Sequence, residues 1–245
     1  MSGLGALLAR ATAGPTYPPD EADLQDIRVA GLDLPLRATV ALFAATALVL
    51  VDFTAVLRDP NAICVFGVRM CGDPWGVAAQ RFMLFGIGPL AIVGLAFRDS
   101  PARYGLRLGD WRWGAGLLAA GIVVMTPIIL GLAQDPHFIT YYRGRGGPFG
   151  EVVGRTALEL FPAEFLFRGF LLFTLFRRIG PLALIVVQVP FVFAHLGKPE
   201  LELWSTFIGG TVFAWLNGRT GSIVWSALGH LYVLMLMLVA VGATA

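Results

Sequence analysis

Long runs of hydrophobic residues alternate with short polar segments along most of the chain. Apolar stretches close to the ~20 residues that cross a hydrocarbon core occur at 38–57, 79–97, 113–133, 155–176 and 221–242. Two shorter apolar stretches are bracketed by glycine-containing turn signals, at 181–196 and 203–217. The pattern predicts an all-α fold, a multi-pass integral membrane helical bundle with about seven transmembrane helices.

The composition agrees with a membrane environment for these helices. Hydrophobic residues make up 57% of the chain and charged residues 14%, whereas soluble domains are about 45–50% apolar. Residues 1–37 contain no long apolar run, and their stretch PPDEADLQD is acidic and begins with prolines. We therefore expect a polar N-terminal segment outside the bilayer at 1–37, with one short helix, and a transmembrane domain at 38–245.

Basic residues predict the orientation of the bundle. Arginines are slightly more numerous in the segments that face inward when the N-terminus is inside, and the loop at 98–112 holds many of them. This predicts a cell-membrane protein with a cytoplasmic N-terminus, in contact with membrane lipid. The net charge is only +2, and the basic residues are spread over several loops, so no nucleic-acid partner is expected.

Two charged residues interrupt the apolar run PAEFLFRGFLL at 162–172. Glu164 and Arg168 stand four residues apart, which places them on one face of a helix in the favourable order for pairing. A charge at mid-membrane costs at least about 2.5–3.5 kcal/mol, so such residues usually face the protein interior. Considered alone, the pair is either a structural ion pair or part of a functional site.

Two of the three histidines also lie at membrane depth. His195 ends the stretch QVPFVFAH, and His230 lies within the last apolar run. A carboxylate with imidazoles can activate water by general-base catalysis. The same three groups, Glu164, His195 and His230, could instead hold a divalent metal such as zinc. The sequence contains no H-E-x-x-H or G-x-S-x-G motif, and the spacing leaves both mechanisms open.

Glu164-x-x-x-Arg168-Gly169, then Phe191-x-x-x-His195, then His230 resembles the CPBP (Abi) family of intramembrane proteases, which includes the CAAX prenyl endopeptidases. The resemblance covers about 150–240. It implies an intramembrane endopeptidase that uses glutamate- and histidine-activated water on a membrane-associated, prenylated or other peptide or protein substrate, with Arg168 as a supporting residue.

The chain departs from the family pattern at two positions. Ala163 replaces the first glutamate of the usual E-E-x-x-x-R, and Leu234 stands where the third motif has Asn or Asp. Three carboxylates could fill the vacancy: Glu164 itself, Glu159, for which we expect an ordinary pairing with Arg155, and Glu202. The alternative interpretation is a catalytically silent family-like protein that acts as a binding or scaffold partner.

Glu202 is the natural substitute for the missing glutamate. It is the last residue of the stretch HLGKPELE, which begins at His195. This stretch resembles a motif of a bacterial branch of the family that also lacks the first glutamate. A loop could fold it back over the cavity. The alternative is that Glu202 and Lys198 form a solvated pair that caps the next helix.

Overall fold

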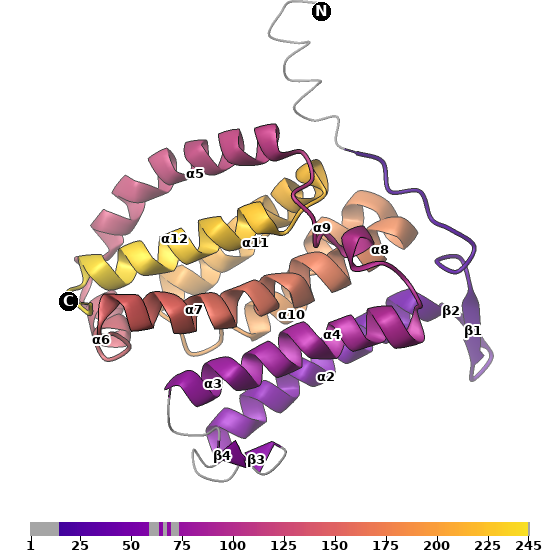
Figure 1. Cartoon of the computed structure of the whole chain (residues 1–245), viewed down its shortest axis with the longest axis horizontal. Helices are drawn as coiled ribbons and strands as arrows, with labels where there is room; N and C mark the ends of the chain where they lie inside the picture. The colour runs from indigo at the N-terminus through magenta and orange to yellow at the C-terminus, as the bar shows by residue number, and fades with distance from the viewer. Residues whose placement is uncertain (1–14, 59–63, 66–67, 70–73, 245) are drawn as a thin grey trace, which may run out of the picture.

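The computed structural model describes residues 15–58, 64–65, 68–69 and 74–244. Within these residues nearly all regular structure is helical (Figure 1). The first half contains β1 (Asp26–Val29), β2 (Leu32–Pro35), α2 (Leu36–Arg58), β3 (Cys64–Val65), β4 (Val68–Arg69), α3 (Pro74–Arg81), η1 (Phe82–Ile87), α4 (Gly88–Ala91), η2 (Ile92–Ala96), η3 (Pro101–Tyr104) and α5 (Trp111–Leu132). The second half contains α6 (Pro136–Arg143), α7 (Phe149–Glu164), η4 (Phe165–Leu171), α8 (Leu172–Ile179), η5 (Gly180–Leu182), α9 (Ala183–Val186), α10 (Gln188–Phe193), α11 (Glu200–Thr220) and α12 (Val224–Ala240).

The predicted all-α membrane bundle is confirmed. Of the described residues, four helical segments are long and apolar enough to cross a membrane: Leu36–Thr54, Pro74–Ala96, Trp111–Leu132 and Phe149–Phe193. α12 is a shorter apolar helix. The fourth segment reverses direction between α8 and α10 (Figure 1), and Gly180, between these helices, has a φ of 60°. Each of the seven predicted spans therefore corresponds to helical structure, although not every one meets the length and hydropathy expected of a full span.

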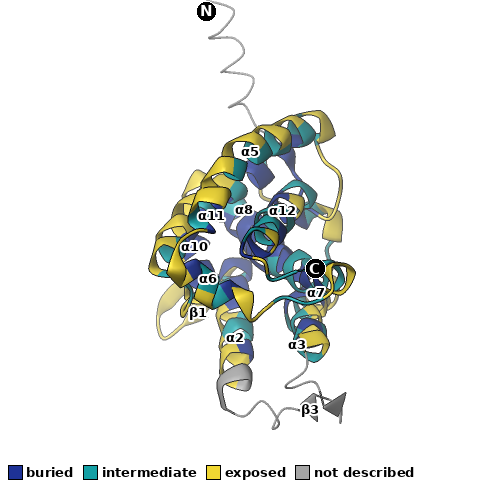
Figure 2. Ribbon diagram, turned by 90° about the vertical axis from the view of Figure 1, so that its left-hand side faces the viewer, coloured by how far each residue is buried: buried dark blue, intermediate teal, exposed yellow. Residues whose placement is uncertain are grey.

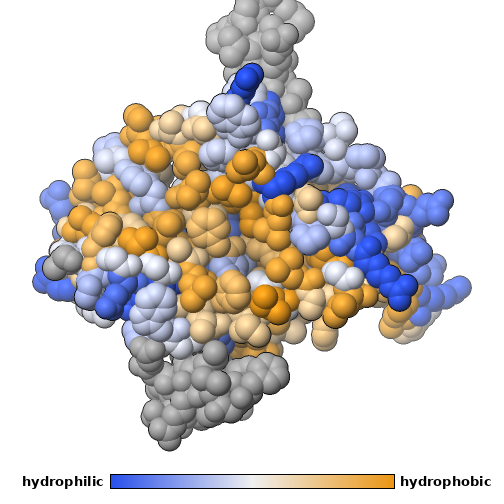
Figure 3. All heavy atoms as spheres, viewed as in Figure 1, coloured by the Kyte–Doolittle hydropathy of each residue, from blue (hydrophilic) through white to orange (hydrophobic). Residues whose placement is uncertain are grey.

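The surface agrees with this assignment. The long helices run side by side along the horizontal axis of Figure 1. Hydrophobic side chains cover the middle of the visible face, and hydrophilic ones gather toward its two ends (Figure 3). We call the end with β1, β2 and the loop 97–110 the hairpin end, and the opposite end, with α6 and the loop 194–199, the α6 end.

Local sequence signals begin and end several of these helices. The Asp110 carboxylate accepts a hydrogen bond from the Trp113 backbone N–H at 3.3 Å at the start of α5, and Asp135 accepts from the His137 N–H at 2.8 Å at the start of α6. Both are the N-cap interaction expected of an aspartate. α11 ends at Gly221, whose φ of 70° is the left-handed conformation that glycine adopts readily.

The centre of the bundle is the segment formed by α7, η4 and α8. Every residue of η4 is buried, and Phe167, Phe170 and Leu172 belong to one hydrophobic cluster with residues of α2, α4 and α10. α5 and α2 lie at the outside, with much exposed surface (Figure 2). Because hydrocarbon surrounds such helices, exposed apolar faces are expected there. The charged pair of the sequence therefore lies on the most enclosed helix.

The described part of the N-terminal segment is folded onto the hairpin end. The expected short helix is absent from residues 15–35, which instead form a turn followed by the antiparallel pair β1–β2. Tyr17 donates a hydrogen bond to the Gly218 carbonyl at 2.8 Å and contacts the rings of Phe173 and Phe176. The polar residues of this segment predicted an exposed helix. Its conformation is instead determined by specific contacts with the helical bundle.

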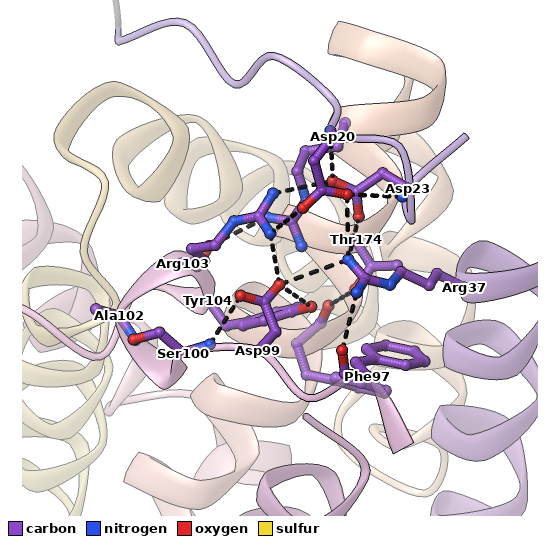
Figure 4. A network of polar contacts seen from close by, with 12 residues as sticks. Asp20, Asp23, Arg37, Phe97, Asp99, Ser100, Ala102, Arg103, Tyr104 and Thr174 are labelled. Carbon is purple, nitrogen blue, oxygen red and sulfur yellow. Dashed lines mark hydrogen bonds and ion pairs between the residues drawn. The ribbon is translucent and has the colours of Figure 1, made fainter. Parts of the chain in front are cut away.

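A network of aspartates and arginines holds this segment in place (Figure 4). Asp23 is 4% exposed. Its carboxylate lies 2.8 Å from Arg37, 3.0 Å from Arg103 and 3.1 Å from Arg177. Asp99 pairs with Arg37 and Arg103 in the same network. These contacts join the N-terminal segment to α2, η3 and α8, three elements that are far apart in the sequence.

Candidate active site

Glu164 and Arg168 lie where α7 passes into η4. The helix widens there into a π-helical segment, Phe165–Leu171, a distortion that is frequent at functional sites. Arg168 Nη1 donates a hydrogen bond to Glu164 Oε1, and each side chain is 1% exposed. The predicted pairing is present, in an environment that excludes water from both charges.

Two side chains of α12 hold the Glu164 carboxylate from the opposite side. His230 Nδ1 lies 2.9 Å from Oε1, and the Ser226 hydroxyl donates to Oε2 at 2.8 Å. Ser226 and His230 are four residues apart and therefore point from the same face of the helix. Both carboxylate oxygens are thus occupied. A role for Ser226 was not predicted from the sequence, although its S-x-x-x-H spacing from His230 places both side chains on one face of a helix.

His195 lies beside His230. It follows the last turn of α10, and its Nδ1 is 2.8 Å from the Phe191 carbonyl oxygen. The imidazole rings of His195 and His230 are stacked, with centroids 6.4 Å apart and an interplanar angle of 20°. The structure therefore brings Glu164, Arg168, His195 and His230 into one neighbourhood, although they come from three different helical regions.

The hydrogen-bond partners fix the tautomer of each imidazole. The Phe191 carbonyl and the Glu164 carboxylate can only accept, so Nδ1 carries the hydrogen in both histidines. In the neutral rings, Nε2 then has its lone pair free to accept a proton or to bind a metal. Both side chains are partly exposed, His230 by 16%. The site therefore offers two neighbouring bases.

Two aromatic rings contact the Arg168 guanidinium. Its guanidinium carbon lies 3.9 Å from the centroid of the Phe191 ring and 5.4 Å from that of Phe213. Such cation–π contacts contribute ~2 kcal/mol or more when the cation is desolvated. The guanidinium atoms Nε and Nη2 are buried and have no hydrogen-bond partner in the described part of the chain.

Glu202 is bound at the α6 end. Its carboxylate lies 2.7 Å from Lys198 Nζ and accepts from the Tyr142 hydroxyl, which is 2.7 Å from both oxygens. Burial and the neighbouring Glu202 raise the pKa of Tyr142, so the phenol keeps its hydrogen and acts as a donor. The described residues show no hydrogen bond between Glu202 and His195, although the Lys198 backbone N–H donates to the His195 carbonyl.

Glu159 has a different partner from the one expected. It pairs with Arg81 of α3 at 2.7 Å, and Arg81 also pairs with Asp52 of α2. Arg155 instead donates to backbone carbonyls of residues 145 and 146. The expected Arg155–Glu159 pair was wrong, because a cation on a neighbouring helix lies closer to Glu159 than the arginine one turn away. Glu159 has a structural partner and does not join the carboxylate–imidazole site.

The geometry of the described residues does not form a complete set of metal ligands. Among the described residues, no group of three or more His, Cys, Asp and Glu side chains is arranged to hold a metal ion. Glu164 Oε1 already contacts Arg168 and His230, which leaves the two imidazole Nε2 atoms as the ligands available to a metal. A divalent metal such as zinc, held by Glu164, His195 and His230, stays an untested alternative.

These features define a class of protein: a multi-pass helical membrane protein with a buried carboxylate held by an arginine, a serine and an imidazole. Residues 145–236, less than half of the chain, match the model of a protein family described as type II CAAX prenyl endopeptidase Rce1-like. The matched segment includes Glu164, Arg168, His195 and His230. The predicted resemblance to the CPBP family is confirmed over this segment. No curated protein and no solved structure matches the chain.

Proposed function

We propose that the chain is an intramembrane endopeptidase that hydrolyses a peptide bond in a membrane-associated peptide or protein, prenylated or not. The observation that carries this proposal is the pair of stacked imidazoles, His195 and His230, anchored through Nδ1 and beside a buried carboxylate. Imidazole with a free Nε2 is the commonest general base in enzymes. The match to a family of CAAX endopeptidases supports the same reaction class.

In the proposed mechanism His195 Nε2 takes a proton from a water molecule. The water oxygen attacks the carbonyl carbon, and the protonated imidazole then returns the proton to the leaving amine, so that one base serves both steps. His230 lies next to this base and keeps its orientation through the Glu164 carboxylate. The Phe191 carbonyl orients the base His195, and the Glu164 carboxylate orients the neighbouring His230.

Glu164 serves this mechanism best as a positioning residue. Its two oxygens accept hydrogen bonds from Arg168, Ser226 and His230, and stabilisation of the charged form makes a carboxylate a weaker base. Glu202 is the alternative base, because it lies one turn beyond the loop that follows His195. A divalent metal bound to the imidazoles would supply an activated water instead.

The orientation follows from the charge distribution. The hairpin end carries the arginine network of Arg37, Arg103 and Arg177, and basic residues favour the cytoplasmic side. We therefore propose a cell-membrane protein with its N-terminus in the cytoplasm. His195 lies just after the C-terminus of α10, toward the α6 end, so the proposed base lies nearer the opposite membrane surface.

Cleavage by purified protein in lipid vesicles tests the proposal. The substrates are a fluorogenic peptide with a C-terminal farnesylcysteine motif and its unprenylated twin. We expect the wild type to cleave at least one of them, His195→Ala and His230→Ala to lose cleavage, and His137→Ala, an exposed histidine of α6, to keep it. Full activity of His195→Ala would contradict the mechanism, and loss of activity with a chelator, restored by zinc, would favour the metal.

A second candidate function is a catalytically silent membrane protein that binds a peptide or a partner. Ala163 favours it, because an alanine stands where the family pattern has its first glutamate. The two functions are separated by the same vesicle assay together with peptide binding. If the protein is silent, we expect the wild type to bind the peptide without cleaving it. Peptide affinity should then be the same in His195→Ala.

A further inference from the structure

Some hydrogen-bond donors around the two imidazoles have an acceptor in the structure, and others do not. His195 Nδ1 and His230 Nδ1 are bonded to the Phe191 carbonyl and to Glu164. The Ser226 hydroxyl is within hydrogen-bonding distance of Glu164 and of the Ile223 carbonyl, both of which only accept. Arg168 uses Nη1 on Glu164. Within the described residues, Arg168 Nε and Nη2 are buried nitrogen atoms of this site that have no hydrogen-bond partner.

Leaving these donors unpaired is costly. Arg168 is 1% exposed, and a buried donor without a partner destabilises the protein, more so when the group is charged. The contact of the guanidinium with the Phe191 face offsets part of this cost, but an aromatic face does not replace in-plane hydrogen bonds. An acceptor that arrives with a ligand would satisfy both atoms.

The guanidinium shares its aromatic neighbours with the imidazoles. The Phe191 ring is 4.4 Å from the His195 ring and 6.4 Å from the His230 ring, between centroids. Phe213, the second ring near Arg168, lies 6.0 Å from His230. The unused donors therefore belong to the same small region as the bases. They are on η4, in which every residue is buried.

We propose that Arg168 Nε–H and Nη2–H bind the carbonyl oxygen of the scissile peptide and the oxyanion formed from it. This inference rests on the proposed endopeptidase function. Arg168 would then be a catalytic residue as well as the partner of Glu164. Leu234, which stands where the family pattern has Asn or Asp, provides no polar group for this purpose.

The attack of water on the scissile carbonyl produces a negative oxygen, which the positive Arg168 guanidinium can stabilise. When the water oxygen bonds to the carbonyl carbon, its proton passes to His195 Nε2, and the π electrons of the carbonyl move to its oxygen. The oxygen becomes negative and accepts the two N–H bonds of Arg168. When the C–N bond breaks, the carbonyl re-forms and the imidazolium proton goes to the leaving amine. Donors already positioned where such charge develops are a large source of catalysis.

The variant Arg168→Lys separates the two roles of the arginine. Lysine keeps a positive charge that can pair with Glu164, but it lacks the second and third nitrogens of the planar guanidinium. A positioning role alone is largely preserved by lysine, whereas the proposed oxyanion contact is lost. Arg178→Lys is the matched control, since Arg178 forms an ion pair with Asp26 at the hairpin end.

The experiment compares wild type, Arg168→Lys and Arg178→Lys in lipid vesicles. It measures kcat and KM for the peptide, together with Kd for the same peptide carrying a tetrahedral phosphonate in place of the scissile amide. In Arg168→Lys we expect KM within threefold, kcat about 10²- to 10³-fold lower, as for loss of an oxyanion donor, and phosphonate affinity reduced by a similar factor. Wild-type kcat and phosphonate affinity in Arg168→Lys would overturn the inference.

A double variant and a binding measurement cover the cases in which Arg168→Lys does not fold or the wild type does not cleave. If Arg168→Lys does not fold, the double variant Glu164→Gln/Arg168→Gln removes both charges and allows a neutral hydrogen-bonded pair. Its ratio of phosphonate to amide-peptide affinity should fall at least tenfold, and an unchanged ratio would refute the contact. If the wild type cleaves neither peptide, the proposed function fails by itself, and the phosphonate ratio still decides whether Arg168 binds the tetrahedral oxygen.

Discussion

Ser226 donates a hydrogen bond to Glu164 across 62 positions of the sequence, at 2.8 Å and with both side chains buried. The contact ties α12 to the central helix of the bundle and leaves Glu164 Oε1 for Arg168 and His230. The position of one imidazole therefore depends on a hydroxyl that takes no proton in the proposed reaction.

Replacing Ser226 with alanine should weaken both the fold and the site. The change leaves Oε2 of a buried carboxylate without its donor, which costs about 1–3 kcal/mol. We expect the free energy of unfolding in detergent micelles to fall by this amount and kcat to fall more than KM rises. Ser205→Ala is the control, because Ser205 is exposed on α11. Equal stability of the two variants would show that the Ser226 contact contributes nothing.

Removing Arg168 entirely should be far more damaging than replacing it with lysine. Arg168→Ala leaves the fully buried Glu164 without its cation, and breaking a buried ion pair in this way costs about 3–5 kcal/mol. We expect this loss in the free energy of unfolding. Arg178→Ala, which removes a partly exposed pair with Asp26, should cost at most about 1 kcal/mol. The prediction fails if both variants lose the same stability.

The network at the hairpin end should make stability depend on acid. Partial burial raises the pKa of Asp20, but hydrogen bonds from the Asp23 backbone N–H and from Arg103 outweigh it and lower the pKa from 3.8 to about 2. A carboxyl whose pKa is lower in the folded state stabilises the fold above its unfolded pKa, and that stability is lost as pH falls through the folded value.

We therefore expect the contribution of Asp20 to be constant above pH ~4 and to disappear between about pH 4 and 2. The measurement is the melting temperature of wild type and Asp20→Asn at several pH values. Their difference should shrink as pH falls through this window. Asp33→Asn is the control, since its pair with Arg28 is largely exposed. A difference that stays constant from pH 5 to pH 2 would contradict the assignment.

The lengths of the apolar runs and the composition predicted the spans and the elements that carry the site, but not the short helix α6. Each of the seven predicted apolar runs corresponds to helical structure, and the isolated charges marked Glu164 and Arg168 because hydrocarbon makes unpaired charges costly. Partners across the fold could not be predicted. Ser226 lies 62 positions from Glu164, and Arg81 lies 78 positions from Glu159. A local pattern shows which face a side chain lies on, but tertiary packing decides what it meets.

The N-terminal segment before β1 illustrates the same limit. Its acidic, proline-containing sequence predicted an exposed segment, but the carboxylate of Asp23 is buried among three arginines. Those arginines come from α2, η3 and α8, and each alone looked like a loop or membrane-interface residue. These arginines meet because the elements that carry them lie side by side at the hairpin end. The sequence alone does not show this tertiary arrangement.

The identity of the general base can be decided by comparing His195 with Glu202. Glu202 is held by Lys198 and Tyr142, whereas His195 has a free Nε2 beside His230. We expect Glu202→Gln to retain turnover within about tenfold, because glutamine keeps the contact with Tyr142. His195→Ala should lose at least ~10²-fold, the usual contribution of a general base. The measurement is kcat for the fluorogenic peptide in vesicles.

Tyr142→Phe is the control for this comparison. It removes the hydroxyl that binds Glu202 but no candidate base, so its effect measures how far the Glu202 contacts position the loop after His195. If Glu202→Gln abolished turnover while Tyr142→Phe and the fold were unaffected, Glu202 would be the base and would replace the carboxylate absent at Ala163. If Glu202→Gln and Tyr142→Phe lowered kcat by the same small factor, the pair would only hold the loop, and His195 would remain the group that activates water.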